Sequence, residues 1–139
     1  MIQVHDLVKR YGKLVAIDHL SLRIRKNEIY GLLGPNGSGK TTLINCMLAL
    51  LSFDNGEIRI DEKDMSPTAY DLKQKIGIVP QEVAFFDELT VRENIDYFCG
   101  LYVRDKASRK SLVDDAISFT GLSEFVNFRP RKLSGGLKR

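Results

Sequence analysis

The chain has 139 residues, of which 43% are hydrophobic and 28% charged, so it can bury a core and carries enough charge for solubility. Its net charge is only +3, with lysines and arginines interspersed among acids, which gives no reason to expect a nucleic-acid partner. The longest apolar run, "CMLALL", is far below the ~20 residues of a membrane span, the opening "MIQVHDLVKR" lacks an apolar signal segment, and the two cysteines have no CxxC spacing.

The hydrophobic period of the candidate strands changes along the chain. Residues 2–4 ("IQV") and 20–25 ("LSLRIR") alternate between apolar and polar side chains, which is typical of strands with one buried face. Residues 28–34 ("EIYGLLG") are instead a nearly continuous apolar run, as expected of a parallel strand covered on both faces. Alternation returns at 57–61 ("EIRID") after the turn signal "DNG", and a continuous run returns at 75–81 ("KIGIVPQ"). We therefore predict one antiparallel and one parallel sheet, and hence two lobes.

Helical signals fill the intervals between these strands. The segment "TTLINCMLAL" follows Lys40, and Thr90 with Glu93 forms a capping box that opens "VRENIDYFCGLY". A third helix is predicted from an apolar stripe and a terminating glycine at Leu112, Ala116, Phe119 and Gly121. The predicted fold class is mixed α/β.

The strongest chemical signal is "GPNGSGKT", residues 34–41, which fits G-x-x-x-x-G-K-[ST] at every fixed position. It follows an apolar strand and opens a helix, so its backbone N–H groups could wrap a phosphate, and its glycine spacing differs from that of the dinucleotide fingerprint. The alternative is a glycine-rich turn with a surface lysine and no phosphate-binding role. The nucleotide-binding residues predicted from this motif are Gly34, Pro35, Asn36, Gly37, Ser38, Gly39, Lys40, Thr41 and Thr42.

Three further segments give the chain a specific resemblance. With "KRYGKLVAIDHLSLRI" before the phosphate loop, "IGIVPQ" after it and "LSGG" at 133–136, the chain resembles the nucleotide-binding domain of ATP-binding cassette (ABC) transporters over essentially its whole length. The segments "LTVRENIDYFCGLY" and "RKLSGGLKR" look most like domains that serve ABC-2-type exporters.

The resemblance implies an α/β fold in three parts. A P-loop NTPase core is expected from residues 28–54 and 72–82, an antiparallel β lobe from 1–30 and 55–63, and a helical subdomain from 83–139 that ends in the signature motif. In the family, two strands that follow the signature complete the parallel sheet, so we expect an incomplete sheet whose apolar strands lack partners.

The resemblance also assigns roles to single residues. Tyr11 matches the aromatic residue that stacks on adenine, with a half-buried core tyrosine as the alternative. Gln81 matches the glutamine that reaches Mg²⁺ or the attacking water, although a strand-end glutamine can simply face solvent. Lys40 and Gln81 are thus the predicted catalytic residues, and Thr41 and Gln81 the predicted Mg²⁺ ligands. The signature residues that would cap the phosphate of ATP, as a helix N-terminus, are Ser134, Gly135 and Gly136.

Two partners follow from the resemblance. In the family, the signature of one domain faces the ATP of a second nucleotide-binding domain across a head-to-tail dimer. A membrane-spanning permease is the other partner, and its candidate contacts are Phe85 and Phe86, which could equally belong to a small satellite core. These partners would place the protein in the cytoplasm at the inner face of the membrane. One departure from the family is Leu137, where glutamine is common.

A second departure concerns hydrolysis. In the family, the aspartate, glutamate and histidine that complete catalysis follow the signature, so we expect the 139 residues to be an N-terminal part that does not hydrolyse ATP alone. Two alternatives remain open. A soluble ABC ATPase of translation or DNA repair would normally carry tandem cassettes or a long insertion before the signature. A P-loop kinase or GTPase would have no reason to carry Gln81 and "LSGG".

Overall fold

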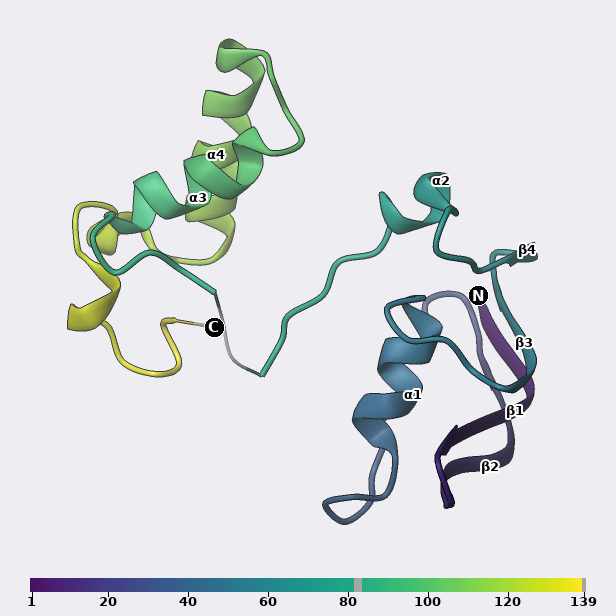
Figure 1. Cartoon of the computed structure of the whole chain (residues 1–139). Coiled ribbons are helices and arrows are strands. Elements are labelled where there is room, and N and C mark those ends of the chain that lie inside the picture. Colours follow the sequence, from purple (N-terminus) through teal and green to yellow (C-terminus); the bar gives the residue numbers. More distant parts are fainter. Residues whose placement is uncertain (82–83, 139) are drawn as a thin grey trace. The chain divides into compact units, whose positions relative to one another are not determined.

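The computed structural model describes residues 1–81 and 84–138. They form two compact units, Met1–Gly77 and Ile78–Arg139 (Figure 1). The predicted boundary between core and helical subdomain, at residues 82 and 83, lies outside the described residues.

The first unit is built on a four-stranded antiparallel sheet. Its strands are β1 (Ile2–Tyr11), β2 (Leu14–Ile24), β3 (Asn55–Ile60) and β4 (Lys63–Asp64), in the order β2-β1-β3-β4. Val4 of β1 lies opposite Leu22 of β2 and Ile58 of β3, and this row faces the core. The predicted antiparallel sheet is therefore confirmed, with longer strands than the alternation alone indicated.

Two helices belong to this unit. Helix α1 (Lys40–Met47) lies beside the sheet in Figure 1 and contributes Leu43 and Cys46 to the core, whose centre includes the fully buried Leu7. The short α2 (Tyr70–Lys73) adds Leu72. Helix α1 ends three residues before the end of the predicted segment. The reason is that the Asn45 carbonyl oxygen accepts the N–H groups of Leu50 and Leu51, and neither bond has the i to i+4 spacing of a helix.

The predicted strands at 28–34 and 75–81 are not strands in the structure. Ile29 and Leu33 are almost fully exposed, at 101% and 93%, and Val79 is 73% exposed. A strand exists only where a second strand pairs with its N–H and C=O groups, and residues 1–81 and 84–138 provide neither segment with such a partner. Most of the apolar side chains expected inside a parallel sheet therefore lie at the surface, whereas Leu32 and Ile76 pack against the edge of the core.

The second unit is helical. It contains α3 (Val91–Gly100), α4 (Lys106–Phe119) and two 3₁₀ turns at Ser123–Phe125 and Pro130–Lys132. The predicted capping box is confirmed: Thr90 N–H donates to Glu93 Oε2 at 2.7 Å, and Glu93 N–H donates to Thr90 Oγ1 at 3.3 Å. The Glu93 carboxylate accepts hydrogen bonds from the backbone N–H and the hydroxyl of Thr90, and these hold the pKa of the carboxyl below its ordinary value.

Helices α3 and α4 lie side by side (Figure 1) and are joined by ion pairs from Arg92 to Asp114 and from Arg109 to Asp96. The predicted stripe on α4 is wrong by one position, because the buried residues are Val113 and Ile117 whereas Leu112 and Phe119 are exposed. Gly121, with φ +69°, directly follows the C-cap residue and ends α4 as predicted.

Candidate nucleotide-binding site

The glycine-rich loop of residues 34–39 leads directly into α1. Gly37 and Gly39 have φ of +82° and +86°, which L side chains rarely adopt. A Cβ on Gly39 would lie 2.5 Å from the backbone oxygen of Ala16, so the loop touches β2 where only glycine fits. The predicted loop and the helix that follows it are therefore both present, and the loop packs against β2 of the antiparallel sheet.

Lys40, the first residue of α1, turns its side chain back into this loop. Its Nζ donates to the carbonyl oxygens of Gly34 at 2.8 Å and Pro35 at 2.6 Å, and to Ser38 Oγ at 3.4 Å. These contacts fix a positive charge at the centre of the loop, next to the N-terminus of an eight-residue helix. A fixed cation combined with the positive end of the helix dipole is suited to bind phosphate groups.

Thr41 and Thr42 occupy the first turn of α1, where Thr41 is exposed and Thr42 half-buried. A hollow of about 370 Å³ lies against the loop, and its lining includes Ala16 and Asp18 of β2 together with Gly34 and Lys40. All four residues belong to the first unit. The exposed Thr41 hydroxyl is therefore accessible to a cation held by phosphates at the loop.

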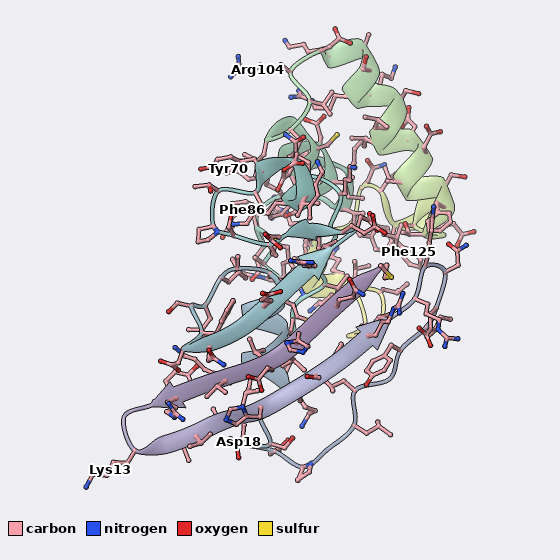
Figure 2. All side chains as sticks on the ribbon, turned by 90° about the vertical axis from the view of Figure 1, so that its right-hand side faces the viewer. Lys13, Asp18, Tyr70, Phe86, Arg104 and Phe125 are labelled. Carbon is pink, nitrogen blue, oxygen red and sulfur yellow. The ribbon has the colours of Figure 1, made fainter. Side chains whose placement is uncertain are left out.

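Tyr11 ends β1 beside the tight turn of the β1–β2 hairpin, whose tip is marked by Lys13 in Figure 2. Tyr11 lies opposite Leu14, two residues before the Ala16 that touches the phosphate loop. The tyrosine side chain is 48% exposed, so its ring has surface available to a ligand. The hairpin therefore holds a partly exposed aromatic residue on the same strand pair that braces the loop.

Gln81 and the signature residues belong to the second unit. Gln81 is exposed, as are Ser134, Gly135 and Gly136. The described signature residues form one turn: Leu137 N–H donates to Ser134 Oγ at 3.4 Å and Lys138 N–H to Ser134 O at 3.2 Å. The second bond has the i to i+4 spacing of a first helical turn, so the predicted helix start stays a prediction.

The predicted Mg²⁺ ligands Thr41 and Gln81 lie in different units, so the structure describes each by itself. Across residues 1–81 and 84–138, no group of three or more histidine, cysteine, aspartate or glutamate side chains is arranged to hold a metal.

Sequence reasoning missed one residue that shapes the loop just before α3. Asn94 of α3 is 7% exposed, and both the oxygen and the nitrogen of its side-chain amide form hydrogen bonds with the preceding loop. Its Oδ1 accepts the Phe86 N–H at 2.7 Å, and its Nδ2 lies 3.0 Å from Phe86 O, 3.3 Å from Leu89 O and 3.0 Å from Thr90 O. The sequence signal is a polar residue on the buried face of α3, three positions after Val91.

Phe85 and Phe86, the predicted permease contacts, begin this loop. Phe86 is 43% exposed and packs edge-on against Tyr97, with ring centroids 4.8 Å apart, and against Phe98 at 6.2 Å. Phe85 lines an apolar cavity of about 400 Å³ that α3 and residues near the signature enclose, Leu133 and Leu137 among them. The second unit thus carries an exposed aromatic cluster and an adjoining apolar cavity.

We expect Asn94→Leu to destabilise the second unit, because the buried backbone groups of the loop would lose their partners. Leaving such groups unpaired costs about 1 to 3 kcal/mol of unfolding free energy. Urea unfolding followed by circular dichroism measures the change, with Asn127→Leu, at an exposed position, as the matched control. Equal midpoints for the two variants would contradict the role given to Asn94.

A glycine-rich loop that opens a helix and encloses the helix's own first lysine is characteristic of P-loop nucleotide-binding proteins. The family model described as "ABC transporter" matches residues 17–139, and the chain belongs to this family.

Similar proteins agree with this assignment. The chain is 35% identical over 139 residues to the linearmycin resistance ATP-binding protein LnrL of Bacillus subtilis, covering 100% of this chain and 45% of that protein. It is 38% identical over 138 residues to the sulfate/thiosulfate import ATP-binding protein CysA of Mycobacterium bovis, covering 99% of this chain and 39% of the relative. The chain therefore spans less than half the length of these relatives.

Solved structures show the same fold. The dimeric ATP-binding cassette MJ0796 bound to ADP and Pi matches with a TM-score of 0.78 and 26% identity, over 99% of this chain and 65% of that one. The structure of cbiO1 from Clostridium perfringens matches with a TM-score of 0.88 and 25% identity, over 99% and 57%. The predicted α/β cassette with a P-loop core and an antiparallel β lobe is confirmed.

Proposed function

We propose that this chain is the nucleotide-binding part of an ABC transporter ATP-binding subunit and binds Mg-ATP to drive transport through a membrane partner. The observation that carries the proposal is the Lys40 ammonium, held inside the glycine loop by the Gly34 and Pro35 carbonyl oxygens. Phosphate oxygens are stronger acceptors for an ammonium than amide carbonyls, because the hydrogen bond is then charged on both sides.

The residues present fit ATP. Lys40 and the N–H groups that open α1 would hold the phosphates, and the glycines leave the backbone free to approach them. Tyr11, on the hairpin that touches the loop, would stack on the adenine. Mg²⁺, when bound, supplies neutralisation of the phosphate charge, and Thr41 and Gln81 would be its protein ligands. Lys40 would stabilise charge that develops on the phosphates, and Gln81 would orient water.

A second nucleotide-binding domain completes the proposed site. The exposed signature turn at Ser134, Gly135 and Gly136 offers backbone N–H groups without side-chain bulk, and a Cβ at either glycine would meet no atom within 4 Å. Such a surface suits the phosphate end of a nucleotide held by another copy or a paralogue. The similar cassette MJ0796 is dimeric with ADP and Pi, which supports a pair of such domains.

The membrane partner is proposed to meet the second unit at Phe85 and Phe86. Phe86, Tyr97 and Phe98 are all more than a third exposed, and together they form the aromatic cluster beside the apolar cavity. No helix among the described residues is long and apolar enough to cross a membrane. From the aromatic cluster we propose a cytoplasmic protein that is attached to the inner face of the membrane through a permease.

The named relatives are import and resistance proteins, which favours transport over the soluble ABC ATPases of translation or DNA repair. Because these relatives include both resistance and import proteins, the ABC-2 exporter subtype stays a prediction. Isothermal titration calorimetry of the purified chain with ATP, with and without Mg²⁺, tests the proposed function. We expect saturable ATP binding that Mg²⁺ strengthens. No heat of binding at millimolar ATP would contradict it.

For the membrane contact, we expect Phe86→Ala in the assembled transporter to lower both transport and recovery of the permease with the ATPase, while ATP affinity stays unchanged. The reason is that Phe86 offers apolar area to a partner but lies in the unit without the phosphate loop. Co-purification and transport assays measure the effect. Phe119→Ala is the control, since this residue is 92% exposed on α4. If Phe86→Ala unfolds the second unit, the aromatic cluster is a satellite core and the contact is wrong.

A further inference from the structure

Lys9 of β1 lies in an unusual place for a lysine. Among residues 1–81 and 84–138 it is the only buried charged side chain, with 9% of its surface exposed. The ion pairs found in that part of the chain do not include it. Its ammonium instead lies over the ring of Tyr11, with Nζ 5.2 Å from the ring centroid. Because a buried lysine usually has an opposing carboxylate, the contact with the ring is unusual.

The strand ladder fixes both partners of this contact. Lys9 and Tyr11 are two residues apart on β1, where alternate side chains share one face. Lys9 lies opposite Ile17 and Tyr11 opposite Leu14, so both backbones are held by β2. Lys9 also lies within electrostatic range of Cys46 of α1: burial raises the pKa of that thiol above its ordinary value, and the charge of Lys9 opposes the rise.

We infer that Lys9 is a positioning residue of the nucleotide site, whose ammonium occupies one face of the Tyr11 ring and holds that ring so that its other face receives a purine base. This inference rests on the proposed function, because it assumes that Tyr11 meets the base. A cation over an aromatic face is attracted by the ring's electron density, and the attraction restricts ring rotation. Lys9 itself does not touch the ligand.

Loss of the Lys9 ammonium should affect only the binding of the base. Losing the ammonium would free the ring but leave the phosphate loop intact, because Lys40 and its carbonyl partners lie elsewhere in the unit. Binding of a nucleotide should therefore weaken, whereas binding of a triphosphate without a base should not. A purely electrostatic role for Lys9 predicts a different result, because a lost positive charge would weaken the binding of both ligands alike.

The test is calorimetric titration of the whole chain with ATP and with tripolyphosphate. Lys9→Met keeps the length of the stem and removes the charge, and we expect it to raise the Kd for ATP about two- to fivefold and to leave the Kd for tripolyphosphate unchanged. Lys9→Arg keeps the cation and should bind ATP like the unsubstituted chain. Lys13→Met, at the exposed hairpin tip shown in Figure 2, removes the same charge without a ring contact and should change neither Kd.

In a Tyr11→Ala background, Lys9→Met should cause no further loss of ATP affinity, because the lysine acts through the ring. The inference is overturned if Lys9→Met leaves the Kd for ATP unchanged, if it weakens ATP and tripolyphosphate equally, or if the two substitutions add. An unsubstituted chain that binds neither ligand defeats the proposed function and the inference together. A chain that binds both ligands but is insensitive at Lys9 defeats the inference alone.

Discussion

Lys40→Ala is expected to weaken ATP binding by at least tenfold. The substitution removes the cation that the Gly34 and Pro35 carbonyl oxygens hold at the centre of the loop. A charge-assisted hydrogen bond contributes about 1.5 to 3 kcal/mol, and about 1.4 kcal/mol corresponds to a factor of ten in Kd. Isothermal titration calorimetry with Mg-ATP measures the change.

The matched control is Lys26→Ala, which removes an equal charge from an exposed position in the same unit. Its affinity should stay within about twofold of the unsubstituted chain, as expected for a screened surface charge. Circular dichroism checks that Lys40→Ala keeps its fold, because the lysine also satisfies two carbonyl oxygens. A folded Lys40→Ala chain with unchanged ATP affinity would refute the assignment of the phosphate site.

Gly56→Ala is expected to give the largest loss of stability. Gly56 lies at the start of β3 with φ +106°, and an added Cβ would lie 2.6 Å from Asp6 O, 2.7 Å from His5 O and 2.7 Å from Leu7 Cα. All three are backbone atoms of β1, so no side-chain rotation relieves the contact. Backbone strain of about 1 to 2 kcal/mol and overpacking of about 1 to 3 kcal/mol together predict a loss of about 2 to 5 kcal/mol.

Gly12→Ala separates these two causes. Gly12 has φ +57° in the β1–β2 turn, and a Cβ there would meet no atom within 4 Å. This control should lose only the strain, about 1 kcal/mol. Urea unfolding of both variants, followed by circular dichroism, gives the comparison. If both lose the same free energy, the close approach of β1 to Gly56 is not what selects glycine.

The close approach has a visible origin in β1. The pairing of β1 with β3 shifts register between His5 and Val8, and Asp6 has φ +50° inside that shift. The bulge pushes the β1 backbone towards β3, where a side chain would not fit. The sequence offered only the "DNG" turn signal at this point, and Asn55 and Gly56 instead belong to β3.

Features carried by local patterns were predicted correctly. The glycine-rich loop before α1 is a contiguous motif, the antiparallel strands follow from alternation, and the capping box at Thr90 and Glu93 needs only four residues. Each depends on neighbours within one turn or one strand. The core face of β1, with Val4 opposite Leu22 and Ile58, agrees with the same alternation of apolar and polar residues.

Features that depend on partners distant in the sequence were not predicted correctly. The runs at 28–34 and 75–81 have the composition of buried parallel strands, but a strand needs a neighbour, and composition does not provide one. The stripe on α4 was misplaced because Leu112 and Val113 are both apolar, and only the position of α3 decides which is buried. The role of Asn94 was not predicted, because its four hydrogen bonds are with a loop whose path the sequence does not indicate.

We propose that a purine nucleotide lies with its base on the β1–β2 hairpin and its phosphates on the loop before α1. Photolabelling of the chain with 8-azido-ATP, followed by peptide mapping, is the direct test. The azide sits on the base, so we expect label in the hairpin segment that contains Tyr11, and this label should be removed by excess ATP and lost in Lys40→Ala. Label confined to other segments, or label that ATP does not displace, would show that the base does not lie on the hairpin.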